Sequence, residues 1–402
     1  MKKLNYYIKS CLLVALLAAV VCMQSGCKKD NSSSSKGTPV ITSIRNYVAH
    51  PGDSLLSSVG TGQWIVISGK NLKGALAINF DGVKGSFNDA WFSDTSAIAL
   101  IPAVIAFPTI PSDKLNTIQY ITNHGQTTFS FPIVPPAPTI SGISNEDANP
   151  GDSVKINGLS FFFVKSVNYG GIDITSYKAS NDGTFISLAV PAGLTKGPVT
   201  VSTKSGKVTT TYNVHDFVTG VLNNYDNINN FSWGSGTSDN SAGYPGNTGY
   251  YGIMKASNVS AGDGAWWTDG HSININPAQW VPKANLTDTL SHYAVKFEIS
   301  VTKPWTDGSI KILKDYGSYT ALYRPWNTAS GSKVAFTTKG WQTVTIPFSS
   351  FINDKGFPAA TLTDFLGSTG AGGIEFQFIN DSSNTIQTFE VAIDNIRVAR
   401  IK

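Results

Sequence analysis

The strongest constraint on the fold is a pattern that occurs twice between residues 38 and 214. The matched blocks are residues 39–44 (PVITSI) with 138–143 (PTISGI), 51–54 (PGDS) with 150–153 (PGDS), 78–82 (INFDG) with 167–171 (VNYGG), and 102–103 with 191–192 (PA). Their order is kept, and the differences in length fall between the blocks, where loops are expected. The sequence therefore predicts two copies of one small domain.

Each copy consists of short, β-branched, alternating runs, such as residues 64–68 (WIVIS) and 198–202 (PVTVS). Gly, Asn, Asp and Pro separate these runs, as they do between the strands of a sandwich. We therefore expect two immunoglobulin-like β-sandwiches, residues 38–135 and 136–214, each within the range of roughly 80 to 100 residues. The junction contains Pro132, Pro135, Pro136 and Pro138, and prolines restrict the backbone, so this linker should be extended and stiff.

The repeated unit resembles the IPT/TIG immunoglobulin-like domains. The resemblance rests on Pro-x-Ile-x-x-Ile, Pro-Gly-Asp, a strand ending in Ile-Ser-Gly or Ile-Asn-Gly, and a Phe-Asp-Gly type turn. Some members of that family bind DNA, but these copies lack a basic loop and follow an export signal. The resemblance therefore implies spacer domains that contribute reach and no affinity.

Residues 1–27 have the pattern of a lipoprotein signal peptide. A basic start with Lys2 and Lys3 precedes an apolar run at residues 11–21, which is shorter than the about 20 residues of a membrane span. Ser25 and Gly26 precede Cys27, so we expect Cys27 to be lipidated and the chain to be anchored in the outer membrane, exposed at the cell surface. All three cysteines lie within this signal, which excludes an internal disulfide. The polar residues 28–37 should form a flexible tether.

Residues 215–402 predict a third, larger all-β domain. Residues 293–301 alternate, with Val295, Phe297 and Ile299 on one face and Lys296 and Glu298 on the other. Similar alternation recurs in residues 341–346, 373–378 and 389–398, and no window predicts a long amphipathic helix. Long two-faced strands with irregular loops favour a jelly-roll-like β-sandwich.

Five of the nine tryptophans lie between residues 262 and 327, beside turn signals, which suggests that some are exposed. Exposed rings stack on flat partners such as a pyranose face or a nucleobase. The chain has 30 basic and 26 acidic residues, and Lys2, Lys3 and Lys9 belong to the signal, so the exported chain is close to neutral. Near-neutrality argues against nucleic acid and favours a neutral glycan.

The C-terminal domain resembles the glycan-binding domain of surface glycan-binding proteins of the type B class. The resemblance rests on AWW, KFEISVTKPW, YRPW, GWQTVTIPFSSF and VAIDNIRV, in that order. It implies a non-catalytic lipoprotein that captures a neutral β-glucan, xyloglucan-like or another, and that works with components of an outer-membrane glycan transporter.

For the binding platform, the sequence favours Trp267, Trp305 and Trp326, with Tyr323 and Arg324 as secondary contacts. Trp266 adjoins Trp267, and on an extended segment one ring would be buried while its neighbour binds. Trp305 stands at a strand end beside a turn, which favours a binding rim. Trp341 opens a regular strand and is expected in the core, whereas Trp233 and Trp280 stay open between core and rim.

Other chemistries are less favoured. The five histidines have no zinc-like spacing, Asp394 and Asn395 only weakly suggest Ca²⁺, and we expect neither a metal nor a cofactor. A glycoside hydrolase would need two facing carboxylates, and the candidates are Asp263, Asp269, Glu298, Asp307 and Asp315. No motif marks a pair among them, so a hydrolase and a protein-binding adhesin remain alternatives.

Overall fold

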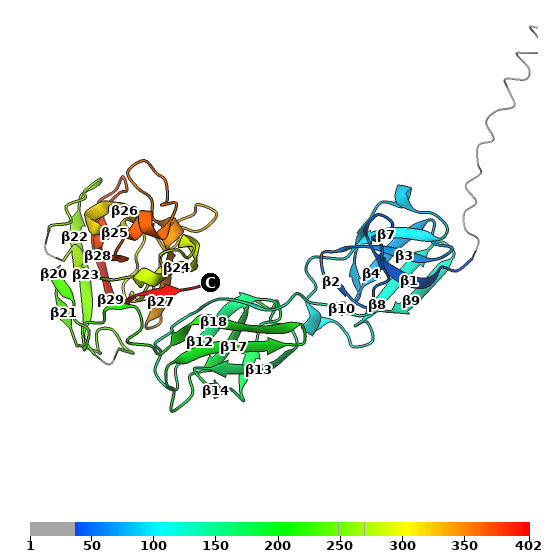
Figure 1. Cartoon of the computed structure of the whole chain (residues 1–402), viewed down its shortest axis with the longest axis horizontal. Coiled ribbons are helices and arrows are strands. Elements are labelled where there is room, and N and C mark those ends of the chain that lie inside the picture. Colours follow the sequence, from blue (N-terminus) through cyan, green and yellow to red (C-terminus); the bar gives the residue numbers. More distant parts are fainter. Residues whose placement is uncertain (1–36, 248, 269) are drawn as a thin grey trace, which may run out of the picture. The chain divides into compact units, whose positions relative to one another are not determined.

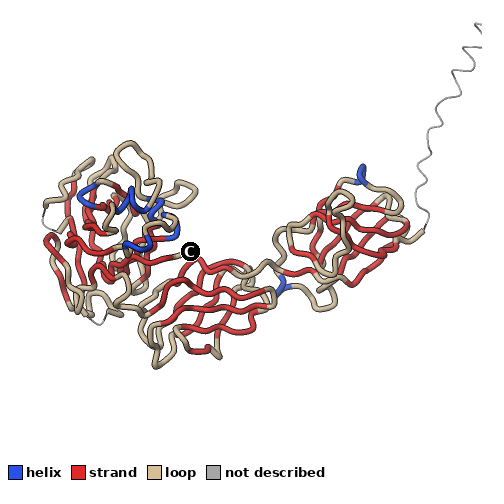
Figure 2. The backbone as a smooth tube through the Cα atoms, viewed as in Figure 1, coloured by secondary structure: helices blue, strands red, loops and turns tan. Residues whose placement is uncertain are grey.

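A computed structural model describes residues 37–247, 249–268 and 270–402. The predicted signal peptide, almost all of the tether, and Cys27 lie outside the described residues. Figure 2 shows that strands dominate and that helices are confined to short turns, which confirms the all-β prediction. The chain divides into two compact units, one ending at Pro135 and the other beginning at Pro136. Within the described part of the chain, no helix is long and apolar enough to cross a bilayer.

The first immunoglobulin-like domain has two four-stranded sheets and one parallel pair. The first sheet has the order β1 (Val40–Asn46), β3 (Trp64–Lys70), β7 (Ser96–Leu100), β6 (Ser86–Phe87). The second has the order β5 (Val83–Lys84), β4 (Ala75–Phe80), β8 (Thr117–Thr122), β9 (Gly125–Ser130), and β10 (Ile133–Val134) pairs with β2 (Val59–Gly60). Alternation in β3 buries Ile65 and Ile67 completely and turns Trp64 outward.

The second immunoglobulin-like domain repeats this arrangement. One sheet has the order β11 (Thr139–Ile143), β12 (Ser153–Leu159), β16 (Phe185–Ala189), β15 (Tyr177–Ala179). The other has the order β14 (Ile172–Asp173), β13 (Val164–Tyr169), β17 (Gly197–Thr203), β18 (Gly206–Val214). Their inner faces enclose one apolar core that includes Ile156, Tyr169 and Val201.

Both copies share a distortion that explains the Ile-x-Gly motif. The pairing of the first strand shifts register next to Ile41 in one copy and next to Ile140 in the other. At Gly69 and Gly158 a Cβ atom would lie 1.9 Å from a backbone carbonyl oxygen of that strand. Only glycine allows the two backbones to approach so closely at this bulge.

The C-terminal domain is a sandwich of two larger sheets (Figure 1). The first has the order β21 (Thr237–Ser238), β22 (Tyr251–Val259), β29 (Ile386–Arg400), β24 (Tyr293–Ser300), β27 (Gln342–Pro347), and β19 (Val221–Asn223) pairs with β29. The second has the order β20 (Phe231–Gly234), β23 (Ser272–Gln279), β28 (Ala371–Ile379), β25 (Ser309–Lys314), β26 (Tyr319–Tyr323). The only α-helix in the described part of the chain is α2 (Leu362–Leu366). The core lies between the inner faces of these two sheets.

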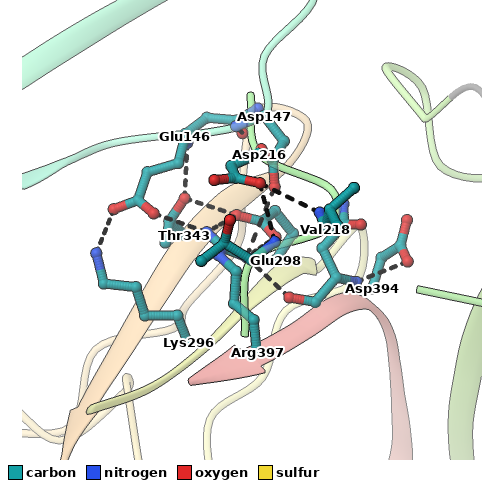
Figure 3. A network of polar contacts seen from close by, with 12 residues as sticks. Glu146, Asp147, Asp216, Val218, Lys296, Glu298, Thr343, Asp394 and Arg397 are labelled. Carbon is teal, nitrogen blue, oxygen red and sulfur yellow. Dashed lines mark hydrogen bonds and ion pairs between the residues drawn. The ribbon is translucent and has the colours of Figure 1, made fainter. Parts of the chain in front are cut away.

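Strand β24 alternates as predicted, but its polar face is not solvated. All eight residues of the strand are buried. Figure 3 shows why: Glu146 of the second immunoglobulin-like domain lies between Lys296 and Arg397, and Thr343 completes the contact. Glu298, which the sequence placed on a hydrophilic face, accepts hydrogen bonds from Arg397 within this network.

Candidate functional site

Two of the three predicted platform tryptophans lie in the core, so that prediction was wrong. Trp305 is 3% exposed and Trp326 is 7% exposed, and both belong to the main hydrophobic cluster of the C-terminal domain. Each indole is satisfied internally, because Trp305 Nε1 donates to Asp307 O and Trp326 Nε1 donates to Gly308 O, both at 2.7 Å.

The reason is the path of the chain after Trp326. The segment doubles back, so that Val334 N donates to Trp326 O and Phe336 exchanges backbone hydrogen bonds with Trp305. The ammonium group of Lys333 lies 5.0 Å from the centroid of the Trp326 ring. A strand end beside a turn therefore became part of the core, because a later loop covers it.

The two residues predicted as secondary contacts, Tyr323 and Arg324, point to opposite sides of the sheet because side chains alternate along a strand. Tyr323 faces inward, where its ring contacts those of Phe297 and Trp305 edge-on, and burial raises the pKa of its hydroxyl. Arg324 lies at the outward side, but its Nε donates to Ser309 Oγ at 2.6 Å and its guanidinium pairs with Asp381. These contacts make Arg324 a structural residue at the border of the sheet, and neither side chain forms the expected contact surface with Trp326.

The neighbouring tryptophans 266 and 267 are brought together with Trp233, a residue that the sequence left undecided. Their segment is a turn, with Asp263 Oδ1 accepting from Ala265 N at 2.7 Å. Trp267 is 68% exposed, and the half-buried Trp266 ring lies 5.8 Å from it and 5.6 Å from the ring of Trp233. Three rings therefore form one cluster, which we call the C-terminal tryptophan cluster (Trp233, Trp266 and Trp267).

This cluster borders the outward face of the five-stranded sheet, the face opposite the core. Because Ile273, Ile374 and Ile312 point into the core, the residues next to them in each strand point outward. The strand register places these outward residues in two rows across the sheet. The first row is Trp233, Asn274, Glu375, Leu313, Thr320, and the second is Ser272, Gln377, Lys311, Leu322.

Polar acceptors without partners form the floor of this face. Asn274 Oδ1 and Glu375 Oε1 are buried and have no hydrogen-bond partner, while Gln377 Nε2 donates to Glu375 Oε2 at 2.9 Å. Burial raises the pKa of Glu375, and the hydrogen bond from Gln377 opposes this shift. An unpaired buried acceptor costs free energy, so these two oxygens are suited to receive hydroxyl donors from a ligand.

The face is hollowed where these residues meet the rings. A depression of about 350 Å³ is lined by Trp266, Lys311, Tyr316, Glu375 and Gln377, among others, and a narrow crevice continues toward Asn274 and Trp233. Tyr316, in the turn η5 (Asp315–Gly317), is 81% exposed and lines both the hollow and the crevice, where Trp233 is also part of the lining. Rings thus flank a polar floor, an arrangement that can stack on sugar rings while acceptors bind their hydroxyls.

A larger hollow, about 860 Å³, lies between the second immunoglobulin-like domain and the C-terminal domain. Its lining includes Lys155, Lys339 and Trp341. Trp341 is only 7% exposed and its Nε1 donates to Tyr244 O, which confirms the prediction that it is structural. Trp280 is also buried. Because this hollow offers no exposed ring, we regard the sheet face as the better site despite its smaller volume.

No group of three metal-ligating side chains is close enough to hold an ion among the residues that the structure describes. Asp394 and Asn395 form a bulge in β29, where the pairing with β24 shifts register. Asn395 has a φ of 48°, and Asp394 accepts a hydrogen bond from Asn247 at 2.6 Å.

Sequence reasoning missed Asn274, Lys311, Tyr316, Glu375 and Gln377. A signal was present for two of them, because the alternation of residues 373–378 places Glu375 and Gln377 on the polar side of their strand. The same signal selected Glu298, which the second immunoglobulin-like domain covers. Alternation therefore identified polar faces but not which of them stays free.

The fold and this face together define a class: a multidomain all-β protein whose last sandwich presents aromatic rings and unpaired acceptors to a ligand. Residues 214–400 match the family model described as the surface glycan-binding protein B xyloglucan binding domain. The match spans nearly all of the C-terminal domain, and the resemblance noted from the sequence is confirmed.

Other proteins are similar to this chain over part or nearly all of its length. An IPT/TIG domain-containing protein of Bacteroides ovatus is 27% identical over an alignment of 209 residues, which covers 48% of this chain and 42% of the relative, so the match spans less than half of that protein. The crystal structure of the surface glycan-binding protein PbSGBP-B from Prevotella bryantii superposes with a TM-score of 0.66 at 22% identity, covering 92% of this chain and all of that one. An SGBP-B from a xyloglucan utilization locus of Bacteroides uniformis gives a TM-score of 0.50 at 21% identity, covering 90% of this chain and 99% of that one. These structures show that the domain architecture is shared.

Proposed function

We propose that this chain is a non-catalytic cell-surface lipoprotein that captures a neutral β-glucan, of the xyloglucan type, on the outward face of the five-stranded sheet. The observation that carries the proposal is the union of the C-terminal tryptophan cluster with the unpaired oxygens of Asn274 and Glu375 on one hollowed surface. Ring stacking supplies affinity, and the two acceptors fix the orientation of the sugar.

The charges of the face suit an uncharged polymer. Lys311 and Glu375 carry opposite charges and both line the same depression. An anionic polymer would need a surplus of cations there, and the chain as a whole has a formal net charge of only +4 before the signal is removed. The family model of the C-terminal domain is named for xyloglucan, which favours that β-glucan over others.

Capture without cleavage is the better fit to the carboxylates of this face. Hydrolysis needs two carboxyl groups about 5 to 10 Å apart across the scissile bond. Glu375 lines the hollow, whereas Asp315, which lines the adjoining crevice, accepts from Gly373 N through Oδ1 and from Lys314 through Oδ2. Of the other acids considered from the sequence, Glu298 is bound by Arg397 and Asp307 by Lys333.

The cellular part of the proposal rests on the sequence. Cys27 behind its signal supports a lipid anchor in the outer membrane, and the polar tether supports exposure at the cell surface. A surface protein of this kind would pass its glycan to the components of an outer-membrane transporter.

The test is calorimetric titration of the mature full-length chain with soluble xyloglucan, mixed-linkage β-glucan and an α-glucan. Losing one stacked ring should weaken binding about 5- to 150-fold, so Trp233→Ala and Trp266→Ala should each lower the affinity for xyloglucan by such a factor. Tyr250→Ala is the matched control, because Tyr250 is 47% exposed but precedes β22 in the other sheet. Unchanged binding by both tryptophan variants would refute the site, and release of reducing sugar by the pure protein would refute the absence of catalysis.

A further inference from the structure

The first immunoglobulin-like domain carries a second cluster of exposed rings, formed by Tyr47, Trp64 and Trp91. Their exposed fractions are 52%, 38% and 50%. The ring of Trp64 lies 6.1 Å from that of Tyr47 and 5.9 Å from that of Trp91, so the three rings are contiguous. We call them the N-terminal aromatic cluster. The resemblance stated from the sequence implies that this domain is a spacer without affinity for a ligand.

The second copy of the domain has no aromatic residue at the positions that correspond to Tyr47 and Trp64. Ile44 pairs with Ile67 in the first copy as Ile143 pairs with Ile156 in the second. Counting along the paired strands from these residues places Glu146 where the first copy has Tyr47, and Ser153 where it has Trp64.

Trp91 also lacks a counterpart in the second copy. It lies in η1 (Asp89–Trp91), within a connection between β6 and β7 that is longer than the one between β15 and β16. The second copy thus forms the same sandwich without these aromatic residues. Large exposed rings that make no contribution to the core indicate a binding surface.

The N-terminal aromatic cluster repeats the geometry of the C-terminal tryptophan cluster. Trp64 and Trp91 are 5.9 Å apart with ring planes tilted by 55°, and Trp233 and Trp266 are 5.6 Å apart with ring planes tilted by 46°. Both clusters combine an outward ring on a strand with a ring from an adjoining loop. The same chain therefore presents the same stacking chemistry twice.

Polar groups lie beside the N-terminal cluster. Arg45 lies on β1, the strand that pairs with the β3 strand of Trp64. Its partner in the register is Val66, which is two residues after Trp64 and therefore on the same face. Its guanidinium forms an ion pair with Asp53, while its Nε is buried without a partner. An unpaired donor beside stacked rings suits a ligand that carries hydroxyl oxygens, and an ion pair of opposite charges does not repel a neutral polymer.

We propose that Tyr47, Trp64 and Trp91 form a second glycan-binding platform, which takes pyranose rings of the same neutral β-glucan as the C-terminal face. The inference rests on the proposed function, because it identifies the ligand through the chemistry that the two clusters share. A polymer long enough to reach both platforms binds with a gain in avidity, whereas a short oligosaccharide occupies one platform at a time.

The experiment compares four forms of the mature full-length chain by affinity electrophoresis in gels with high-molecular-weight xyloglucan. They are the unsubstituted protein, Trp64→Ala/Trp91→Ala, Trp233→Ala/Trp266→Ala, and the combination of all four substitutions. We expect Trp64→Ala/Trp91→Ala to weaken binding to the polymer at least about tenfold. We also expect Trp233→Ala/Trp266→Ala to retain weak retardation that disappears in the quadruple variant. In calorimetry with a xyloglucan oligosaccharide, Trp64→Ala/Trp91→Ala should bind at its tightest site with nearly the same affinity as the unsubstituted protein.

Leu76→Ala is the control, because Leu76 is 55% exposed on β4 in the opposite sheet of the same domain. Melting curves of each variant establish that the fold is retained. If the unsubstituted protein binds no glucan, the proposed function fails. If it binds, but Trp64→Ala/Trp91→Ala leaves polymer affinity unchanged, this inference alone is overturned. If Trp64→Ala/Trp91→Ala binds glucan normally but changes its oligomeric state, the cluster serves protein contacts and the inference is likewise overturned.

Discussion

Glu146 and Arg397 are 251 residues apart in the chain, yet Glu146 Oε2 accepts a hydrogen bond from Arg397 Nη2 at 2.7 Å. Glu146 belongs to the second immunoglobulin-like domain and Arg397 to the last strand of the C-terminal domain, and their side chains are 2% and 6% exposed. Lys296 donates to the other oxygen of Glu146, and its ammonium group lies 3.3 Å from the centroid of the Tyr212 ring. A buried network therefore joins these two domains into one compact unit.

Arg397→Met should destabilise this unit strongly, because it removes the counter-charge of buried Glu298 and leaves buried Glu146 with Lys296 as its only cationic partner among the described residues. Breaking a buried ion pair from one side costs about 3 to 5 kcal/mol. Arg400→Met is the matched control on the same strand, since Arg400 is half exposed and its pair with Asp288 should contribute less than about 1 kcal/mol. Denaturant unfolding of both variants measures the two free energies, and equal losses would show that the network does not stabilise the joint.

Trp305→Ala and Trp326→Ala should each lower the free energy of unfolding by about 3 to 5 kcal/mol, because both rings fill the core. Trp267→Ala should leave it within about 0.5 kcal/mol, since that ring is mostly exposed. Thermal melting of the three variants measures which of these substitutions lowers the stability of the fold. Normal melting of the Trp305 and Trp326 variants would contradict the buried positions described above.

Glycan binding should weaken on acidification through Glu375. Burial raises the pKa of this carboxyl, and the ionised form offers the unpaired Oε1 to a sugar hydroxyl. Protonation therefore begins at a higher pH than for an exposed glutamate, and affinity should fall as the pH falls through the raised pKa. Titration with xyloglucan across pH 4 to 8 is the measurement.

The substitution Glu375→Gln keeps the shape of the side chain and should remove this pH dependence. In the unsubstituted protein, the contribution of Glu375 to the free energy of unfolding should depend on pH with the opposite sign to the affinity. A carboxyl with a raised folded pKa favours the native state at low pH and disfavours it as the pH rises between the unfolded and folded pKa values. An affinity that falls equally on acidification in Glu375→Gln would exclude this residue as the cause.

Cys27→Ala should move the protein from the membrane fraction to the soluble periplasmic fraction, because the lipid attached at this residue is the expected anchor. Fractionation of cells that produce each form, with detection by antibody, is the test. Retention of the variant in the membrane fraction would show that another segment anchors the chain.

The sequence by itself determined the all-β class and the duplicated immunoglobulin-like pattern. These follow from local rules: side chains alternate along a strand, Gly69 and Gly158 are required where two backbones meet, and Pro135 and Pro136 interrupt regular pairing. The prediction that Trp341 is structural succeeded for the same reason, because its position at the start of a regular strand is a local property.

Only the tertiary structure decided which aromatic rings are free. Trp305 and Trp326 look like rim residues in sequence, and the loop that returns through Phe336 buries them. The sequence around Trp233 does not indicate whether its ring is buried or exposed. The ring contacts that of Trp266 because β20 forms the edge of the five-stranded sheet. Alternation shows that Glu298 and Glu375 each lie opposite a core face, but domain docking covers the first and leaves the second open to a ligand. Exposure depends on contacts between segments far apart in the chain, and no spacing rule within one segment contains that information.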